Sequence, residues 1–335
     1  MRFPQSNMTF DNRQSTIVNR QSSIAFLFPG QGSQYPGMGK DLANNFAAAR
    51  EVFEEADQAL GFGISRLCFE GSAEELQLTE NTQPAILTVS VAAWRALQSE
   101  GFPTPDYFAG HSLGEYSAHV AAGSLSFADA IQTVRSRGRY MQEAVPLGSG
   151  AMAAVIGAEL EAIEKACEEA RAGQICAPAN INSGSQVVIA GDTAAVDRAT
   201  ELLKGVARKV VKLNVSAPFH CALMLPAQER LAVDLEKLSF GDPQRPVVTN
   251  VDAAAVMSGK ESYEALVRQV SSPVCWSESM EFLIGKGVNT FVEVGPGKVL
   301  CGLMRQISRE VKCLNVEDGA SLRTTQSSLA SVAIN

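Results

Sequence analysis

The sequence predicts an α/β protein with a large domain, built on a mainly parallel sheet, that carries a small inserted domain. Apolar, strand-like segments alternate with helical patterns at both ends of the chain, which is typical of a parallel sheet covered by helices. In the middle of the chain the order becomes strand, helix, strand, strand, helix, strand. That order is typical of a ferredoxin-like βαββαβ unit. We therefore expect the large domain over residues 24–146 and 217–318, and the small domain over residues 147–216.

The first half of the large domain contains the clearest elements. Residues 24–28 are apolar without interruption up to a Pro-Gly turn, which predicts a buried strand. Residues 84–100 carry apolar side chains on two faces and predict a helix that packs on both sides. A short apolar strand at residues 106–109 and a helix at residues 127–144 follow.

The remaining elements continue these patterns. In the small domain we expect strands at residues 151–156, 179–182, 186–190 and 208–213, and helices at residues 159–172 and 193–204. After residue 217 we expect strands near Val247 and at residues 290–294, and helices at residues 223–238, from Glu261, from Trp276 and after Gly297.

Both ends of the chain differ from this pattern. Residues 1–23 lack periodicity and an apolar signal-peptide segment, so we expect a disordered leader. A transit peptide is the alternative, and only this reading would place the protein in an organelle. Residues 319–335 are rich in Ser, Thr and Ala, and we expect a flexible tail.

Composition excludes several classes of function. The chain has 335 residues, 46% of them apolar and 19% charged, which suits a globular enzyme with a large core. No apolar run approaches the roughly 20 residues of a membrane-spanning helix, so we expect no membrane association. The net charge is −8 and there is no basic cluster with interleaved aromatic residues, so we expect no nucleic acid partner.

The cysteines and histidines predict no metal site. The seven cysteines are scattered without a C-x-x-C motif, and the three histidines form no H-E-x-x-H motif. We expect reduced thiols in a reducing compartment, and therefore a cytoplasmic protein.

The segment Gly110-His111-Ser112-Leu113-Gly114 is the strongest chemical motif. It is a G-x-S-x-G sequence between a predicted strand and a predicted helix, as in the nucleophile elbow of α/β-hydrolase-like folds. The sharp turn exposes the serine, and the glycines on either side are needed because the backbones approach too closely for a Cβ atom. The N–H of Leu113 and the start of the helix then face any oxyanion formed at Ser112.

A nucleophilic serine needs a base, and the chain offers three histidines. His111 is adjacent to Ser112, but neighbours on a tight turn diverge. His119 lies two turns into the following helix, where a packing or surface role is expected. His220 follows a loop-like Ala217-Pro218-Phe219 segment at the end of the small domain, where clefts between domains form. His220 is therefore the favoured base, and a structural role is the alternative.

Several separated motifs, in this order, resemble a known family. They are Phe28-Pro29-Gly30-Gln31-Gly32-Ser33-Gln34, Thr82-Gln83-Pro84-Ala85, Gly110-His111-Ser112-Leu113-Gly114-Glu115, Arg137-Gly138 with Met141, Pro218-Phe219-His220 and Glu293-Val294-Gly295-Pro296-Gly297. Together they resemble the malonyl-CoA:acyl carrier protein transacylases of bacterial type II fatty acid synthesis, from about Ile24 to Ile307. The leader before Ile24 is longer than is usual in that family.

The resemblance implies a role for particular residues. Ser112 and His220 would form a dyad, with the backbone carbonyl of Gln269 in place of the usual aspartate. The N–H groups of Gln31 and Leu113 would form the oxyanion hole. Arg137 would bind the free carboxylate of the malonyl group, although helix spacing alone suggests a solvated residue like Arg135 and Arg139. Weaker matches to the site are Gln83, His111, Asn182 and Phe219; Leu113 and Phe219 resemble members selective for malonyl over methylmalonyl groups.

The resemblance also implies a ping-pong reaction without a metal or other cofactor. Malonyl-CoA would acylate Ser112, CoA would leave, and the phosphopantetheine thiol of acyl carrier protein would take the malonyl group. A monomer is the usual state in the family. Three alternatives stay open: a free-standing malonyl acyltransferase that serves a polyketide synthase, a serine esterase or thioesterase that does not need Arg137, and a malonyl-CoA-binding protein with an inactive elbow.

Overall fold

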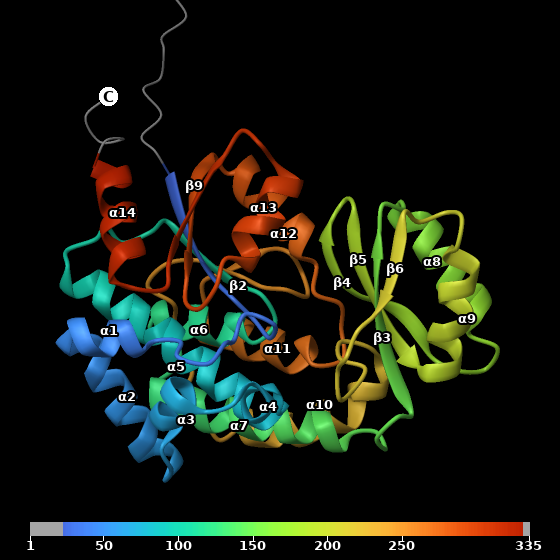
Figure 1. Ribbon diagram of the computed structural model, residues 1–335, viewed down its shortest axis with the longest axis horizontal. Helices are drawn as coiled ribbons and strands as arrows, with labels where there is room; N and C mark the ends of the chain where they lie inside the picture. The colour runs from blue at the N-terminus through green and yellow to red at the C-terminus, as the bar shows by residue number, and fades with distance from the viewer. Residues whose placement is uncertain (1–22, 331–335) are drawn as a thin grey trace, which may run out of the picture.

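The computed structural model describes residues 23–330, which form two sheets flanked by helices (Figure 1). The larger sheet has six strands in the order β10-β9-β1-β2-β7-β8, and every neighbouring pair is parallel except β7 and β8. Its strands are β1 (Ser23–Phe28), β2 (Tyr107–Gly110), β7 (Val247–Val248), β8 (Ala255–Val256), β9 (Val288–Val294) and β10 (Lys312–Val316). The prediction of a mainly parallel sheet is confirmed.

The helices of the larger part pack on both faces of this sheet. They are α1 (Lys40–Asn45), α2 (Ala47–Leu60), α3 (Ile64–Glu70), α4 (Ala73–Gln77), α5 (Thr79–Ser99), α6 (Gly114–Ala121), α7 (Phe127–Glu143), the 3₁₀ turn η1 (Ala222–Met224), α10 (Leu225–Leu235), α11 (Gly259–Gln269), α12 (Trp276–Gly285), α13 (Val299–Ile307) and α14 (Gly319–Ala330).

The core lies where β1 and β2 meet α5. The side chains of Phe26, Phe108 and Trp94 contact one another edge to face, with ring centroids 5.5–6.4 Å apart. Such aromatic pairs add stability beyond the apolar area they bury. The helix α5 is buried on nearly all sides, as its apolar pattern predicts, although it begins at Thr79 rather than at Pro84. This core fixes β1 and β2 in place. The turns that directly follow these two strands carry Gln31 and Ser112.

The second sheet is a ferredoxin-like unit, as predicted. Its antiparallel strands follow the order β4-β5-β3-β6, and α8 and α9 pack on it together. The elements are β3 (Gly150–Ile156), α8 (Leu160–Ala170), β4 (Cys176–Ser183), β5 (Gln186–Asp192), α9 (Thr193–Leu203) and β6 (Lys209–Lys212). The exact domain boundaries given above stay a prediction.

The predicted flexible tail is wrong for most of its length. Residues Gly319–Ala330 form α14, which packs on β10. Leu322 and Thr325 are buried, and the Thr325 hydroxyl donates to the carbonyl oxygen of Asn315. Tertiary contacts therefore order a segment whose composition alone indicates a loose end. Residues 1–22 of the predicted leader and residues 331–335 lie outside the described part of the chain.

Candidate active site

Ser112 occupies the turn between β2 and α6 in a strained conformation. Its φ angle is 52°, in the left-handed region that L-residues other than Asn, Asp and Gly seldom adopt. A Cβ atom added at Gly110 would lie 2.0 Å from the carbonyl oxygen of Gly114, and one added at Gly114 would lie 2.0 Å from the carbonyl oxygen of Phe28. Both glycines are thus required by close backbone approach, as expected for a nucleophile elbow.

His220 contacts Ser112 directly. The Oγ atom of Ser112 lies 2.7 Å from Nε2 of His220, and Nδ1 of His220 lies 3.0 Å from the backbone carbonyl oxygen of Gln269. Because a carbonyl oxygen can only accept, Nδ1 carries the proton and Nε2 is the acceptor. The Ser112 hydroxyl therefore donates to Nε2, which is the arrangement a general base requires.

Burial keeps the His220 imidazole neutral. His220 is 3% exposed, and desolvation together with the nearby charge of Arg137 lowers its pKa to about 3. The ring therefore stays unprotonated, and able to accept a proton, at pH values well below the usual histidine pKa. Once it accepts a proton, the imidazolium is unfavourable and should pass the proton on quickly.

This low pKa predicts a flat pH dependence for acylation of Ser112. Between pH 8 and pH 5.5 we expect the single-turnover rate to fall less than about twofold, whereas a base with an ordinary pKa near 6.5 would lose about tenfold. Rapid-quench measurements across this range check it. The same profile in Glu115→Gln separates His220 from the Glu115 carboxyl, whose pKa is raised by burial to about 7. A tenfold loss centred near pH 6.5 in that variant would contradict the prediction.

Arg137 points its guanidinium at the serine from α7. Its Nη2 donates to Ser112 Oγ at 3.2 Å and to Gln269 Oε1 at 2.8 Å, and Nη1 donates to Gln83 Oε1 at 2.9 Å. The side chain is 1% exposed, and within residues 23–330 no carboxylate forms a direct ion pair with it, although the charge of the Glu115 carboxyl acts on it and opposes the lowering of its pKa by burial. Gly138 allows this placement, since a Cβ atom there would lie 2.6 Å from the carbonyl oxygen of Thr79 on α5.

A buried guanidinium held only by neutral partners is costly, and it is satisfied best by an anion supplied by a ligand. Burial accordingly lowers the pKa of Arg137. The site is thus prepared for a carboxylate close to the serine.

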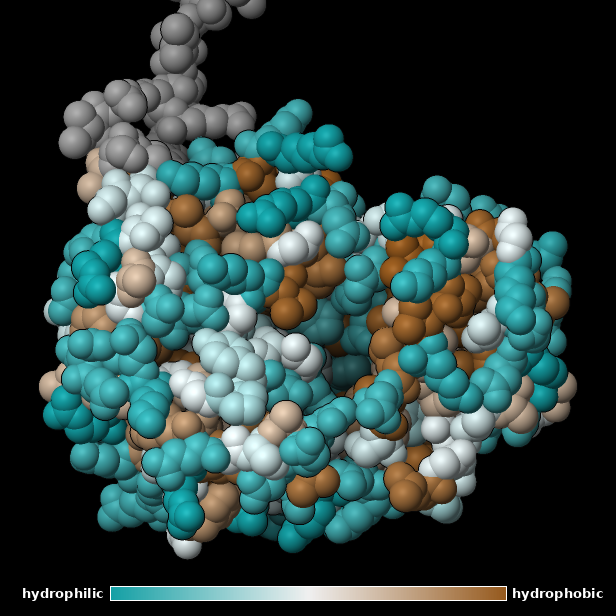
Figure 2. Space-filling view, in the orientation of Figure 1, coloured by the Kyte–Doolittle hydropathy of each residue, from teal (hydrophilic) through white to brown (hydrophobic). Residues whose placement is uncertain are grey.

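These side chains line a cavity of about 130 Å³ between the two sheets. Figure 2 shows the hollow between the two parts of the molecule. Its polar lining is Gln31, Gln83, His111, Ser112, Arg137, Asn180 and His220, and its apolar lining is Leu113, Met141, Met152, Leu213, Val215 and Phe219. Met152 and Asn180 come from the small sheet, so both parts of the chain contribute to the cavity. Its size suits a short acyl group.

The weaker candidates are placed in different ways. Gln83, His111 and Phe219 line the cavity, as do the oxyanion-hole candidates Gln31 and Leu113, whereas Asn182 does not; Asn180 lines the cavity instead. Asn182 Oδ1 accepts a hydrogen bond of 2.8 Å from His111 Nε2. The His111 ring packs against the Trp276 ring, with centroids 5.3 Å apart, and the histidine that contacts Ser112 Oγ is His220.

Asn250 was missed by the sequence analysis. It follows β7, and its Oδ1 accepts from the Ser112 N–H at 2.6 Å while its Nδ2 donates to the Gly110 carbonyl oxygen at 2.7 Å. It therefore bridges both sides of the elbow. No local sequence pattern predicts this role for Asn250, because 138 positions separate it from Ser112.

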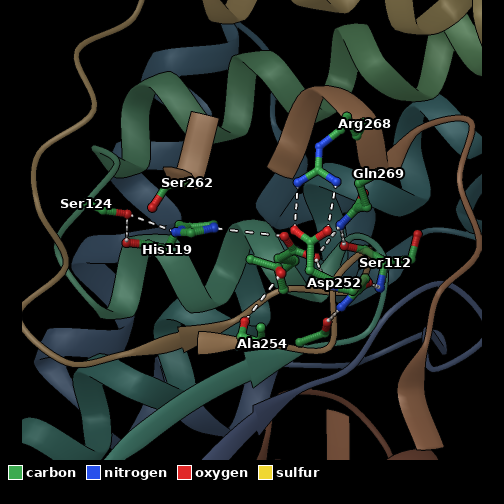
Figure 3. Close-up of polar contacts among 12 residues, drawn as sticks. Ser112, His119, Ser124, Asp252, Ala254, Ser262, Arg268 and Gln269 are labelled. Atoms are coloured by element: carbon green, nitrogen blue, oxygen red, sulfur yellow. Dashed lines mark hydrogen bonds and ion pairs between the residues drawn. The ribbon is translucent and has the colours of Figure 1, made fainter. Parts of the chain in front are cut away.

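The end of α11 is anchored beside the site (Figure 3). Arg268 donates two hydrogen bonds, of 2.8 and 2.6 Å, to the carboxylate of Asp252, and Gln269 next to it points inward. This ion pair is half-exposed, so its own contribution to stability is small. The ion pair helps to hold the end of α11, and with it the Gln269 backbone carbonyl, which accepts the hydrogen bond from Nδ1 of His220.

Other kinds of site are not found in the described part of the chain. Among residues 23–330 no three His, Cys, Asp or Glu residues come together to hold a metal ion, and no helix there is long and apolar enough to cross a membrane. All seven cysteines are free.

The fold and the site are those of an acyltransferase: an elbow serine hydrogen-bonded to a buried histidine, with a buried cation beside them, on an α/β scaffold. The acyl transferase domain family matches residues 25–326, and the chain belongs to this family. Within it, the chain is a member of the malonyl-CoA:acyl carrier protein transacylase group, as the resemblance of its motifs indicates.

Known relatives cover nearly the whole chain. It is 52% identical to malonyl CoA-acyl carrier protein transacylase of Escherichia coli K12 over 284 residues, which are 84% of this chain and 92% of the relative. For the Bacillus subtilis 168 protein of the same name, the identity is 48% over 88% of this chain and 93% of the relative.

Solved structures share this fold. An acyl carrier protein S-malonyltransferase from Vibrio cholerae superposes with a TM-score of 0.89 at 48% identity, over 91% of this chain and all of that one. A malonyl-transacylase in complex with a type II PKS acyl-carrier protein gives 0.90 at 48% identity, over 92% of this chain and all of that one.

Proposed function

We propose that this protein transfers a malonyl group from malonyl-CoA to the phosphopantetheine thiol of acyl carrier protein, for fatty acid synthesis, through a malonyl-Ser112 intermediate. The observation that carries the proposal is the buried guanidinium of Arg137, 3.2 Å from a serine that itself donates to a neutral histidine. A nucleophile next to an unpaired buried cation fits an acyl donor with a free carboxylate better than a neutral ester.

In the first half-reaction, Ser112 Oγ attacks the thioester carbonyl carbon while its proton passes to Nε2 of His220. The negative oxygen of the tetrahedral intermediate accepts hydrogen bonds from the N–H groups of Gln31 and Leu113, both of which line the cavity. The C–S bond then breaks, and Nε2 returns the proton to the departing CoA sulfur. The serine is left as a malonyl ester.

In the second half-reaction the thiol of the carrier takes the place of CoA. Its proton passes to His220, the thiolate attacks the ester carbonyl, and the C–Oγ bond breaks as Oγ recovers the proton. The Gln269 carbonyl keeps the imidazole in the tautomer needed for both steps. Arg137 holds the malonyl carboxylate throughout, with Gln83 and Gln269 fixing the guanidinium. No metal or other cofactor takes part in this proposal.

Intact-protein mass spectrometry tests the central step. Mixing the protein with malonyl-CoA is expected to add one malonyl group, and the adduct should disappear when holo acyl carrier protein is added. Ser112→Ala should show no adduct, since it removes only the nucleophilic oxygen. No adduct in the wild-type protein, or an adduct that decays in water at the same rate with or without carrier, would contradict the proposal and favour a binding protein or a hydrolase.

The similarity to a malonyl-transacylase solved with a type II PKS acyl-carrier protein favours a second candidate function, in polyketide synthesis. A polyketide role would use the same chemistry with another carrier. The ratio of kcat/KM for a fatty acid carrier and a polyketide carrier separates the two functions.

We further propose that the protein is a cytoplasmic monomer. The free cysteines fit a reducing compartment, and size-exclusion chromatography tests the oligomeric state.

A further inference from the structure

The side chain of Gln269 joins three parts of the site. Its Nε2 donates to the Ser112 carbonyl oxygen at 2.9 Å and to Glu115 Oε2 at 2.8 Å, while its Oε1 accepts from Arg137 Nη2 at 2.8 Å. Its backbone carbonyl accepts from Nδ1 of His220. The side chain is fully buried. Which end of this amide faces Arg137 therefore decides how the guanidinium is held.

The orientation of the amide is set by what lies on its other side. A carboxylate oxygen and a carbonyl oxygen that face an amide can only accept, so Glu115 Oε2 and the Ser112 carbonyl require the NH₂ group. A flipped amide would direct oxygen at these two oxygens and NH₂ at the guanidinium of Arg137. Each such buried mismatch costs the full desolvation of the polar group. Glu115 and the Ser112 carbonyl on one side, with the donor-only guanidinium on the other, thus leave only the orientation in which Oε1 faces Arg137.

Glu115 lies three residues after Ser112 on α6 and is completely buried. Its Oε2 also accepts from the backbone N–H of Asn250 at 2.9 Å. Its Oε1 faces Nε2 of His119 at 4.0 Å, and Nδ1 of His119 lies 2.9 Å from the Ser124 hydroxyl oxygen (Figure 3). Burial raises the pKa of Glu115 to about 7. Any proton would reside on Oε1, because Oε2 already accepts two hydrogen bonds, so Oε2 stays an acceptor in either state.

We propose that Glu115 is a positioning residue that fixes the orientation of the Gln269 amide and thereby holds Arg137 ready for the acyl carboxylate. The inference rests on the proposed function, in which Arg137 binds that carboxylate. An acetyl donor has no carboxylate and does not depend on this alignment. Loss of the acceptor should therefore weaken malonyl transfer selectively, chiefly through KM for malonyl-CoA.

The test compares two replacements of similar size. Glu115→Leu removes the acceptor, and we expect kcat/KM for malonyl-CoA to fall about 10- to 100-fold, as loss of hydrogen bonds to a charged network implies. The rate with acetyl-CoA should change less than about threefold, well below the malonyl effect. Glu115→Gln keeps an oxygen that can accept from Gln269, and its NH₂ group can face His119. It should restore the malonyl-to-acetyl ratio to within about threefold of wild type.

A double-mutant cycle with Gln269→Leu completes the test. If Glu115 acts through Gln269, then Glu115→Leu should change the ratio little in a chain that already lacks the amide. Equal losses with both donors, or a glutamine variant as poor as leucine, would overturn the proposal. If Glu115→Leu does not fold, Gln269→Leu alone must lower the malonyl-to-acetyl ratio, and an unchanged ratio overturns it. Arg137→Ala tests the proposed function separately from the role of Glu115. An unchanged malonyl-to-acetyl ratio in that variant refutes the binding of the acyl carboxylate by Arg137.

Discussion

Replacing His220 with alanine is expected to slow acylation of Ser112 by about 10²- to 10⁴-fold, the usual contribution of a positioned general base. The serine hydroxyl would lose its acceptor, Nε2 of His220, which lies 2.7 Å away. Arg137, which also contacts the hydroxyl, can only donate. Single-turnover formation of the malonyl-enzyme, followed by mass spectrometry, measures the effect. Binding of malonyl-CoA should change little, because the variant keeps Arg137, which we propose as the partner of the substrate carboxylate.

A matched control is His220→Gln, which places an amide oxygen near the serine but cannot carry away a proton at neutral pH. We expect it to acylate as slowly as the alanine variant. If the glutamine variant kept a rate within tenfold of wild type, His220 would act by orienting the hydroxyl and not as a base. If alanine itself stayed within tenfold, another group would accept the proton and the dyad would be wrong.

The elbow and the main core elements could be predicted because their signals are local. A strand, a tight turn and a helix occur within a few residues around Ser112, and the glycine spacing reports close backbone approach directly. The strand at Ser23–Phe28 is recognisable from its unbroken apolar run. His220 could be placed only by its position at the end of the small domain, which is a weaker argument.

Arg137 shows where local signals stop. On α7 it is spaced like Arg135 and Arg139, and helix periodicity cannot tell which of the three is buried. What buries Arg137 is the close packing of α7 against α5 at Gly138, together with polar partners from α5 and α11. Only the resemblance to a family singled it out beforehand.

Asn250 and the side-chain role of Gln269 could not be predicted for a related reason. Both act through hydrogen bonds to residues about the elbow that lie 138 and 157 positions away in the chain. Such contacts depend on how β7 and α11 pack against α6, and one sequence carries no record of that packing. Glu115 belongs to a recognisable motif, but its burial and the two hydrogen bonds that its Oε2 accepts from Asn250 and Gln269 depend on the folded structure.

Replacing Arg137 with alanine is expected to remove the preference for malonyl-CoA over acetyl-CoA. Loss of one partner of a buried ion pair costs about 3–5 kcal/mol, so the ratio of kcat/KM for the two donors should fall by a few hundred- to a few thousandfold. The loss should come from the malonyl donor. Acetyl transfer is expected to hold or to rise, because alanine removes a buried charge that an acetyl group leaves without a counterion.

Arg137→Lys gives the control that distinguishes charge from geometry. An ammonium keeps the positive charge but lacks the planar fork that matches a carboxylate, and it cannot donate to Gln83, Gln269 and the substrate in the same fixed plane. We expect lysine to recover only part of the malonyl preference. Full recovery would mean that charge alone selects the donor and that the two glutamines merely fill space. An unchanged ratio in the alanine variant would contradict the carboxylate clamp, and the buried guanidinium would then serve the fold instead of selecting the acyl group.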